Sequence, residues 1–196
     1  MEILGKILGT PARVKIMRLF LLNKGKGFKI ADIAKRSRVA GNSARSELRI
    51  LASASFIKKK SPSSNEWVFN PVFKYSREFE DLLFRSDTMN NEYITGTFKK
   101  VGKIKLLVTS GVFIKNTDSR VDILIVGDKL NRVKIEEGIK KLEAELGAEL
   151  SYAVFETKEF LYRLSMYDKL IRDILDFPHE VVVQAKELST QSLKNA

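Results

Sequence analysis

Apolar positions recur with helical spacing in three stretches near the start of the chain. Thr10 and Pro11 suit an N-cap followed by a first helical position, and the first pattern ends near Gly25. A turn at residues 38–41 separates the second pattern from the third, which predicts a helix-turn-helix. The apolar positions are Val14, Met17 and Leu21, then Ile30, Ile33 and Ala34, and last Ala44, Leu48, Leu51 and Ala52.

A β-hairpin with a polar tip is predicted directly after the third helix, and we call it the wing. Its tip is the polar run at residues 61–65, which contains three serines, a proline and an asparagine. The first strand would hold Phe56, Ile57, Lys58, Lys59 and Lys60, and the second Trp67, Val68 and Phe69.

The segment from Pro71 onward predicts an amphipathic helix that links the two halves of the chain. This helix could pack against its own N-terminal domain or form a dimer interface. Both roles are compatible with each other, so both interpretations stay open. The polar stretch at residues 86–91 marks the predicted domain boundary. The apolar positions of the helix are Val72, Tyr75, Phe79, Leu82 and Leu83.

The second half of the chain alternates short apolar runs with helical patterns, which predicts an α/β domain. Strands are expected at residues 104–109, 121–126 and 148–156, and at the three valines that follow His179. A helix is expected at residues 131–147, and a further helical pattern runs through Phe160 to Ile174. We interpret His179 itself as structural.

The charge distribution separates these halves. The first 70 residues carry 15 Lys and Arg against 4 Asp and Glu, a net charge of +11, while the remaining 126 residues carry 20 of each. Such a cationic module indicates a polyanionic partner such as nucleic acid, although a solvated basic surface is the simpler alternative.

The composition excludes several classes of function. The chain has no Cys and one His, which removes disulfides, thiolate metal sites, thiol nucleophiles and multi-histidine sites. No apolar run reaches the length of a membrane span, and the first ten residues are too short for a signal peptide. We therefore expect a cytoplasmic protein with no membrane partner, no metal and no cofactor.

The third helix carries the candidate base-reading residues. Arg can bond bidentately to guanine and Asn to adenine in the major groove, so this face suits direct readout of duplex DNA. The wing lysines Lys58, Lys59 and Lys60 would lie along phosphates, with a solvated edge strand as the alternative. The face itself comprises Asn42, Ser43, Arg45, Ser46 and Arg49.

Residues 8–70, from the segment LGTPARVKIMRLFLL to the hairpin, resemble an ArsR-like (arsenic-repressor-like) winged helix-turn-helix. The resemblance implies a dimeric, sequence-specific transcriptional regulator that binds double-stranded DNA. Two features depart from the family. The cysteines of its metal sensors are absent, and Ala40 replaces the polar residue that usually caps the recognition helix, which leaves Asn42 or Ser43 to help in capping.

Residues 90–184, with LLVTSGVFIKNTDSRVDILIVGD and a later helical segment, resemble a minimal nucleotidyltransferase domain of the polymerase-beta-like superfamily. In active members a Gly-Ser pair holds phosphates, and two acids spaced i, i+2 on the next strand bind Mg²⁺. The corresponding positions here are Thr109 with Ser110, and Arg120 with Asp122. Because a cation replaces the first acid, we expect no catalytic residue and no transferase activity.

The same alignment predicts a candidate ligand pocket lined by Ser110, Gly111, Arg120 and Asp122. Arg120 could bind a phosphate-bearing ligand there. The alternative is that Arg120 and Asp122 form an ion pair that replaces the metal.

These observations predict an α/β (α+β) protein of two domains. Residues 1–70 form the winged helix-turn-helix, 71–89 the linking helix, 90–184 the nucleotidyltransferase-like domain, and 185–196 a tail that is frayed after Lys186. The expected function is a homodimeric DNA-binding transcriptional regulator with an inactive C-terminal domain that senses a small-molecule or protein effector. The alternatives are a metal-dependent nucleotidyltransferase and a protein-interaction module of the toxin–antitoxin type.

Overall fold

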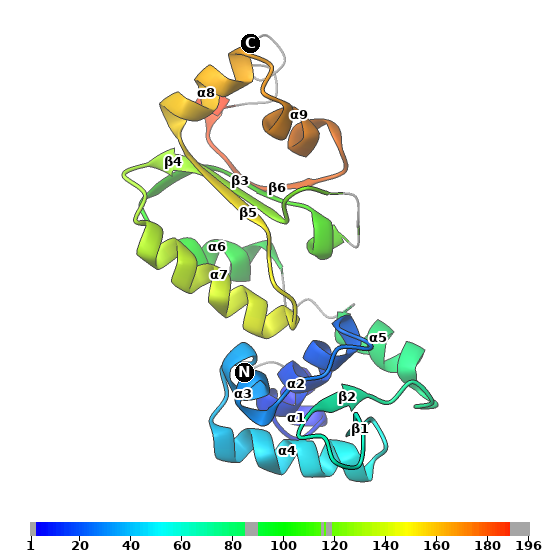
Figure 1. Ribbon diagram of the computed structural model, residues 1–196. Coiled ribbons are helices and arrows are strands. Elements are labelled where there is room, and N and C mark those ends of the chain that lie inside the picture. Colours follow the sequence, from blue (N-terminus) through cyan, green and yellow to red (C-terminus); the bar gives the residue numbers. More distant parts are fainter. Residues whose placement is uncertain (1–2, 85–89, 115, 117–118, 189–196) are drawn as a thin grey trace. The chain divides into compact units, whose positions relative to one another are not determined.

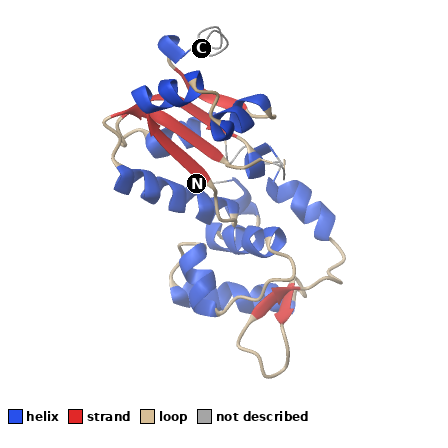
Figure 2. Ribbon diagram, turned by 45° about the horizontal axis from the view of Figure 1, so that its top comes forward, coloured by secondary structure: helices blue, strands red, loops and turns tan. Residues whose placement is uncertain are grey.

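The computed structural model describes residues 3–84, 90–114, 116 and 119–188, and it shows a mixed α/β chain with two sheets (Figures 1 and 2). The chain splits into two compact units. The first comprises Met1–Thr88 and Lys140–Glu149, and the second comprises Met89–Ile139 and Leu150–Ala196. Most of the predicted boundary at residues 86–91 lies outside the described residues.

The helices of the first unit begin where local signals place them. Thr10 caps α2, and its hydroxyl oxygen accepts the Arg13 N–H at 3.0 Å, while Pro11 is the first helical residue. These features confirm the predicted start of the first helix. The turn before α4 contains Arg38 in the left-handed region, with φ of 50°. The helices are α1 Ile3–Ile7, α2 Pro11–Leu22, α3 Ile30–Arg36 and α4 Gly41–Ser53. The apolar pattern did not predict α1.

The predicted hairpin is confirmed. Strands β1 (Ile57–Lys59) and β2 (Trp67–Phe69) pair antiparallel, with Lys58 opposite Val68, and the isolated bridge from Phe28 to Trp67 adds a third segment. The wing is therefore joined to the loop between α2 and α3 as well as to α4.

Helix α5 (Ser76–Phe84) corrects the predicted linking helix, which was expected to start at Pro71. The Phe73 N–H donates to the Asn70 carbonyl, so the chain turns before it becomes helical, and Val72 is 82% exposed. Phe73 and Phe79 instead lie edge-on to the buried Phe56 ring, with centroids 5.1 and 6.1 Å from it. This packing supports the interpretation that the helix covers its own domain, while a role in dimerisation stays a prediction.

The second unit is built on a four-stranded sheet of order β5-β4-β3-β6. The central pair β3–β4 and the pair β3–β6 are antiparallel, whereas β4 and β5 are parallel and are connected through α7. All the strands expected from the sequence are present. The bounds are α6 Asn91–Phe98, β3 Lys103–Thr109, β4 Ile123–Asp128, α7 Arg132–Leu146, β5 Tyr152–Glu156, α8 Thr157–Ser165, α9 Lys169–Asp176 and β6 Glu180–Gln184, with short 3-10 turns at Gly111–Ile114 and Lys186–Leu188.

Helices cover both faces of this sheet (Figure 1). Helices α8 and α9 pack on one face, where Phe160, Ile171 and Ile174 join strand residues such as Leu124 in one apolar cluster. Helix α6 and the first half of α7 lie on the other face, and they approach so closely that a Cβ at Gly138 would stand 2.6 Å from the Phe98 ring. The central strands β3 and β4 are thus buried on both sides, as their continuous apolar runs require, while the edge strands β5 and β6 stay partly exposed.

The end of the described chain differs from the predicted frayed tail. Leu188 is fully buried in the cluster beneath α8 and α9, and its carbonyl accepts a hydrogen bond from the Gln184 side chain. The buried Lys105 ammonium pairs with Glu187 at 3.3 Å and with Asp128 at 2.9 Å. The prediction is therefore wrong for Glu187 and Leu188, because one apolar side chain in a polar segment completes the core. Residues 189–196 lie outside the described residues.

Across the ranges that the structure describes, no helix combines the length and apolar character that a membrane crossing needs.

Candidate nucleic-acid interface

The polar residues of α4 lie on one exposed face of the helix. Ala44, Leu48 and Leu51 are buried in the core of the first unit, so the residues between them point away from that core. All five predicted base-reading residues are exposed, namely Asn42, Ser43, Arg45, Ser46 and Arg49.

The two arginines of this face differ in their partners. The Arg45 guanidinium donates to the Asn42 side-chain oxygen at 3.0 Å, one helical turn away. Arg49 makes no hydrogen bond or ion pair with any residue that the structure describes. Arg49 can therefore bind an external acceptor without breaking an internal contact, whereas Arg45 and Asn42 orient each other.

An ion pair between the half-buried Arg13 and the buried Glu47 contacts α4 on the side away from its polar face. The Glu47 side chain is 7% exposed, and its two oxygens accept the Arg13 Nε–H at 2.7 Å and the Thr10 hydroxyl at 2.8 Å. Because Thr10 caps α2, this network joins the first turn of α2 to the middle of α4. None of its residues was among the predicted functional residues, although an acid between Ala44 and Leu48 on an otherwise basic module is a sequence signal for a buried partner.

The prediction that Asn42 or Ser43 helps to cap α4 is wrong. Ala40 occupies the N-cap position, and no side chain accepts a hydrogen bond from the first turn. Asn42 and Ser43 lie inside the helix rather than before it, where a capping side chain must stand. The exposed first-turn residues 41–43 therefore leave their N–H groups without a capping side chain, which suits a phosphate group.

The three wing lysines are exposed but not equivalent. Lys59 lies over the Trp67 ring, 4.4 Å from its centroid, and Lys60 pairs with Glu66 at 2.8 Å. The hydrogen bond from Lys60 lowers the pKa of the Glu66 carboxyl, so this pair stays ionised at neutral pH. Lys58 has no such partner among the described residues. Further exposed cations that the sequence analysis left unassigned are Lys26, Lys29, Lys35 and Arg38.

The predicted pocket of the second unit does not form as one site. Hydrogen bonds within the turn after β3 occupy three of its residues. The Asp122 carboxylate accepts the Val112 and Ser151 N–H groups, both at 2.8 Å. The Ser110 hydroxyl donates to the Val121 carbonyl at 3.0 Å. Gly111 has φ of 55°, and a Cβ there would collide with the Asp122 carboxylate.

Arg120 points elsewhere, which makes the expected Arg120–Asp122 pair wrong. Its guanidinium pairs with Asp173 of α9 at 2.5 Å. Both Arg120 and Asp122 precede β4 instead of lying on it, so the alternation that would align their side chains does not apply. Arg120 lines a cavity of about 220 Å³ together with Lys169, Asp173 and Phe177, apart from the Ser110 turn.

The second unit shows no metal centre in the part that the structure describes. Within the described ranges, no group of three or more His, Cys, Asp or Glu side chains is placed so that it could hold a metal ion. The His179 ring lies 2.8 Å from the Phe177 carbonyl.

Asp168 gives the second unit a pH-dependent element. Its carboxylate caps α9 by accepting the Ile171 and Leu170 N–H groups, and it also pairs with Arg163. These contacts, chiefly the Ile171 hydrogen bond, lower the pKa of Asp168. A depressed folded-state pKa stabilises the fold above the ordinary aspartate pKa, and this stability is lost as the pH falls below about 4. We expect the α9 amide protons to exchange faster as the pH is lowered through that range, after correction for the intrinsic exchange rate.

The matched control is Asp168→Asn, which keeps an oxygen for the cap but has no charge to titrate. Its corrected exchange rates should change less between pH 5 and pH 3. An equally steep change in this variant would assign the pH dependence to other groups.

Comparison with known protein families, curated proteins and solved structures finds no match for this chain.

Proposed function

We propose that the chain is a sequence-specific DNA-binding transcriptional regulator of the ArsR-like winged helix-turn-helix type, acting in the cytoplasm as a homodimer. The observation that carries the proposal is the face of α4, where five polar side chains are exposed opposite a buried apolar stripe. In this proposal α4 enters the major groove, and Arg49 and the Arg45–Asn42 pair contact base edges.

The charge of the first 70 residues supports a nucleic-acid partner. The first 70 residues carry the whole net charge of +11, and the exposed cations lie on α3, on α4, in the wing and in the loop before α3. Neutralising phosphates with these groups releases counterions, which supplies affinity that does not depend on sequence. The wing then orients the protein on the duplex, while α4 supplies the selectivity.

We assign a non-catalytic role to the second unit. The acid that a two-metal transferase would use, Asp122, is occupied by two backbone N–H groups, and Arg120 pairs with Asp173. In this proposal the nucleotidyltransferase-like domain senses an effector or bridges to a partner.

A second candidate, a protein-interaction module, is favoured by one observation. Tyr162 in the last turn of α8 and Met166 and Tyr167 directly after that helix are 66%, 65% and 69% exposed. Large apolar side chains gathered in this way suit a protein partner. A stoichiometric partner that is lost from a Tyr162→Ser/Tyr167→Ser variant would support this candidate over DNA binding.

The test of the proposed function is selection of bound sequences from a random duplex DNA pool at physiological salt, since low salt would retain any DNA on a cationic protein. We expect enrichment of a two-fold symmetric motif with half-sites about one helical turn apart. A pool that stays unenriched would contradict sequence-specific regulation, and an asymmetric motif would contradict the symmetric homodimer.

A further inference from the structure

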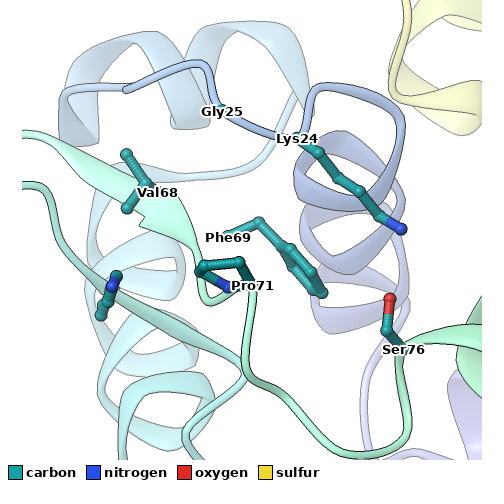
Figure 3. Close-up of a pocket in the computed structure, with 7 residues that line it drawn as sticks. Lys24, Gly25, Val68, Phe69, Pro71 and Ser76 are labelled. Carbon is teal, nitrogen blue, oxygen red and sulfur yellow. The ribbon is translucent and has the colours of Figure 1, made fainter.

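A cavity of about 320 Å³ lies in the first unit beside the wing (Figure 3). Its apolar wall is formed by Val68 and Phe69 of β2 and by Pro71, which follows that strand. In Figure 3 Phe69 and Pro71 lie between Val68 on one side and Lys24 with Ser76 on the other. The volume corresponds to a ligand of about ten to fifteen non-hydrogen atoms, at the lower end of small-molecule sites.

The two lysines that line this cavity are in different electrostatic states. Lys24 pairs with Glu80, which also accepts the Ser76 hydroxyl at 3.1 Å, so the charge of Lys24 is compensated. The Lys24 ammonium also lies 5.4 Å from the centroid of the Phe69 ring. Lys58 also lines the cavity, and it forms no ion pair or hydrogen bond with any residue in the described part of the chain.

An apolar wall beside one uncompensated ammonium selects for a particular ligand chemistry. The apolar wall suits an aromatic or branched hydrocarbon body, and the Lys58 ammonium suits a carboxylate. A dianion such as a phosphate monoester fits less well, because only one cation is free and the Glu80 carboxylate stands at the same edge.

We propose that this cavity binds a small organic monocarboxylate with an apolar body, held by Lys58, and that the bound ligand weakens DNA binding. The second half of this inference rests on the proposed function, in which Lys58 lies along a phosphate. A ligand that neutralises Lys58 removes that phosphate contact. Because the ligand lies between the wing and the start of α5, it also restricts the orientations in which the wing can contact the duplex.

The first experiment tests the ligand without DNA. The full chain, labelled with ¹⁵N, is titrated with 4-phenylbutyrate and, separately, with the uncharged 4-phenyl-1-butanol. We expect saturable shifts of the Val68, Phe69 and Ser76 amides with a Kd on the order of 0.1 mM for the carboxylate, and binding of the alcohol about tenfold weaker. Absence of saturable shifts at these amides, or equal affinity for both probes, would overturn the proposal.

Two matched lysine variants test the anchor. Lys58→Met keeps the length of the side chain and should remove the preference for the carboxylate over the alcohol. Lys60→Met changes the lysine directly after β1, which pairs with Glu66 and does not line the cavity, so it should leave both titrations unchanged. Retention of the carboxylate preference in Lys58→Met would exclude Lys58 as the anchor.

The second experiment adds the duplex selected above. We expect saturating 4-phenylbutyrate to raise the Kd for that duplex about three- to tenfold, and to have no such effect in Lys58→Met. An unchanged Kd would overturn the regulatory half alone. If the protein binds no duplex specifically, the proposed function and the regulation fail together, while the ligand assignment still stands on the first experiment.

Discussion

Arg49→Ala is expected to bind the selected duplex ten- to hundredfold more weakly than the unchanged protein, with a much smaller loss on random-sequence DNA. The reason is that a guanidinium without an internal partner can form two parallel hydrogen bonds to one guanine, a contact worth about 1–3 kcal/mol of discrimination. Fluorescence anisotropy with labelled duplexes at physiological salt measures both affinities.

Arg45→Ala and Lys59→Ala provide the comparisons. Arg45 already bonds to Asn42, so its loss also frees the Asn42 side chain, and we expect a reduction in specificity within the same range. Lys59→Ala should weaken binding to all sequences similarly and reduce the slope of log K against log salt by about 1, since a phosphate contact carries no sequence information. Equal losses on selected and random DNA for Arg49→Ala would defeat the base-readout assignment.

Glu47→Ala is expected to lower the free energy of unfolding of the first unit by about 3 kcal/mol. The substitution leaves the Arg13 guanidinium and the Thr10 hydroxyl without the acceptor that joins α2 to α4. Trp67, the single tryptophan of the chain, lies in β2 of the same unit, so urea unfolding followed by its fluorescence reports on this unit.

The control is Ser46→Ala, which changes the neighbouring exposed residue and should alter stability by less than about 0.5 kcal/mol. A double-mutant cycle with Arg13→Ala then isolates the pair, because both single variants should lose most of the same interaction. A loss below about 1 kcal/mol for Glu47→Ala would show that the buried network does not hold α4.

The elements around the candidate interface were predictable because their signals are local. Thr10 and Pro11 mark a helix start by their own backbone preferences, and a run of polar residues between two apolar runs marks a hairpin. The exposed face of α4 followed in the same way, since helical spacing places Ala44 and Leu48 on one side and Arg45 and Arg49 off it.

The errors arose where a residue's position depends on a distant partner. The linking helix begins at Ser76 rather than Pro71, because the Asn70 side chain bonds to the Ser55 carbonyl and Phe73 packs on Phe56. Arg120 pairs with Asp173, more than fifty residues away, instead of with Asp122 in its own loop. Helical or strand periodicity carries no information on such contacts.

The sequence by itself determined the separation of charge between the two halves, the absence of cysteine chemistry, and the side chains that α4 presents to solvent. Each depends on composition or on the repeat of one element. Only the tertiary structure decided which of the many charges already have partners: Glu47 holds Arg13, Glu80 holds Lys24, and Lys58 is left beside an apolar cavity. Ion pairs form between groups that packing brings within a few ångströms, so their pairing follows from how the elements pack against one another and cannot be read from their order along the chain.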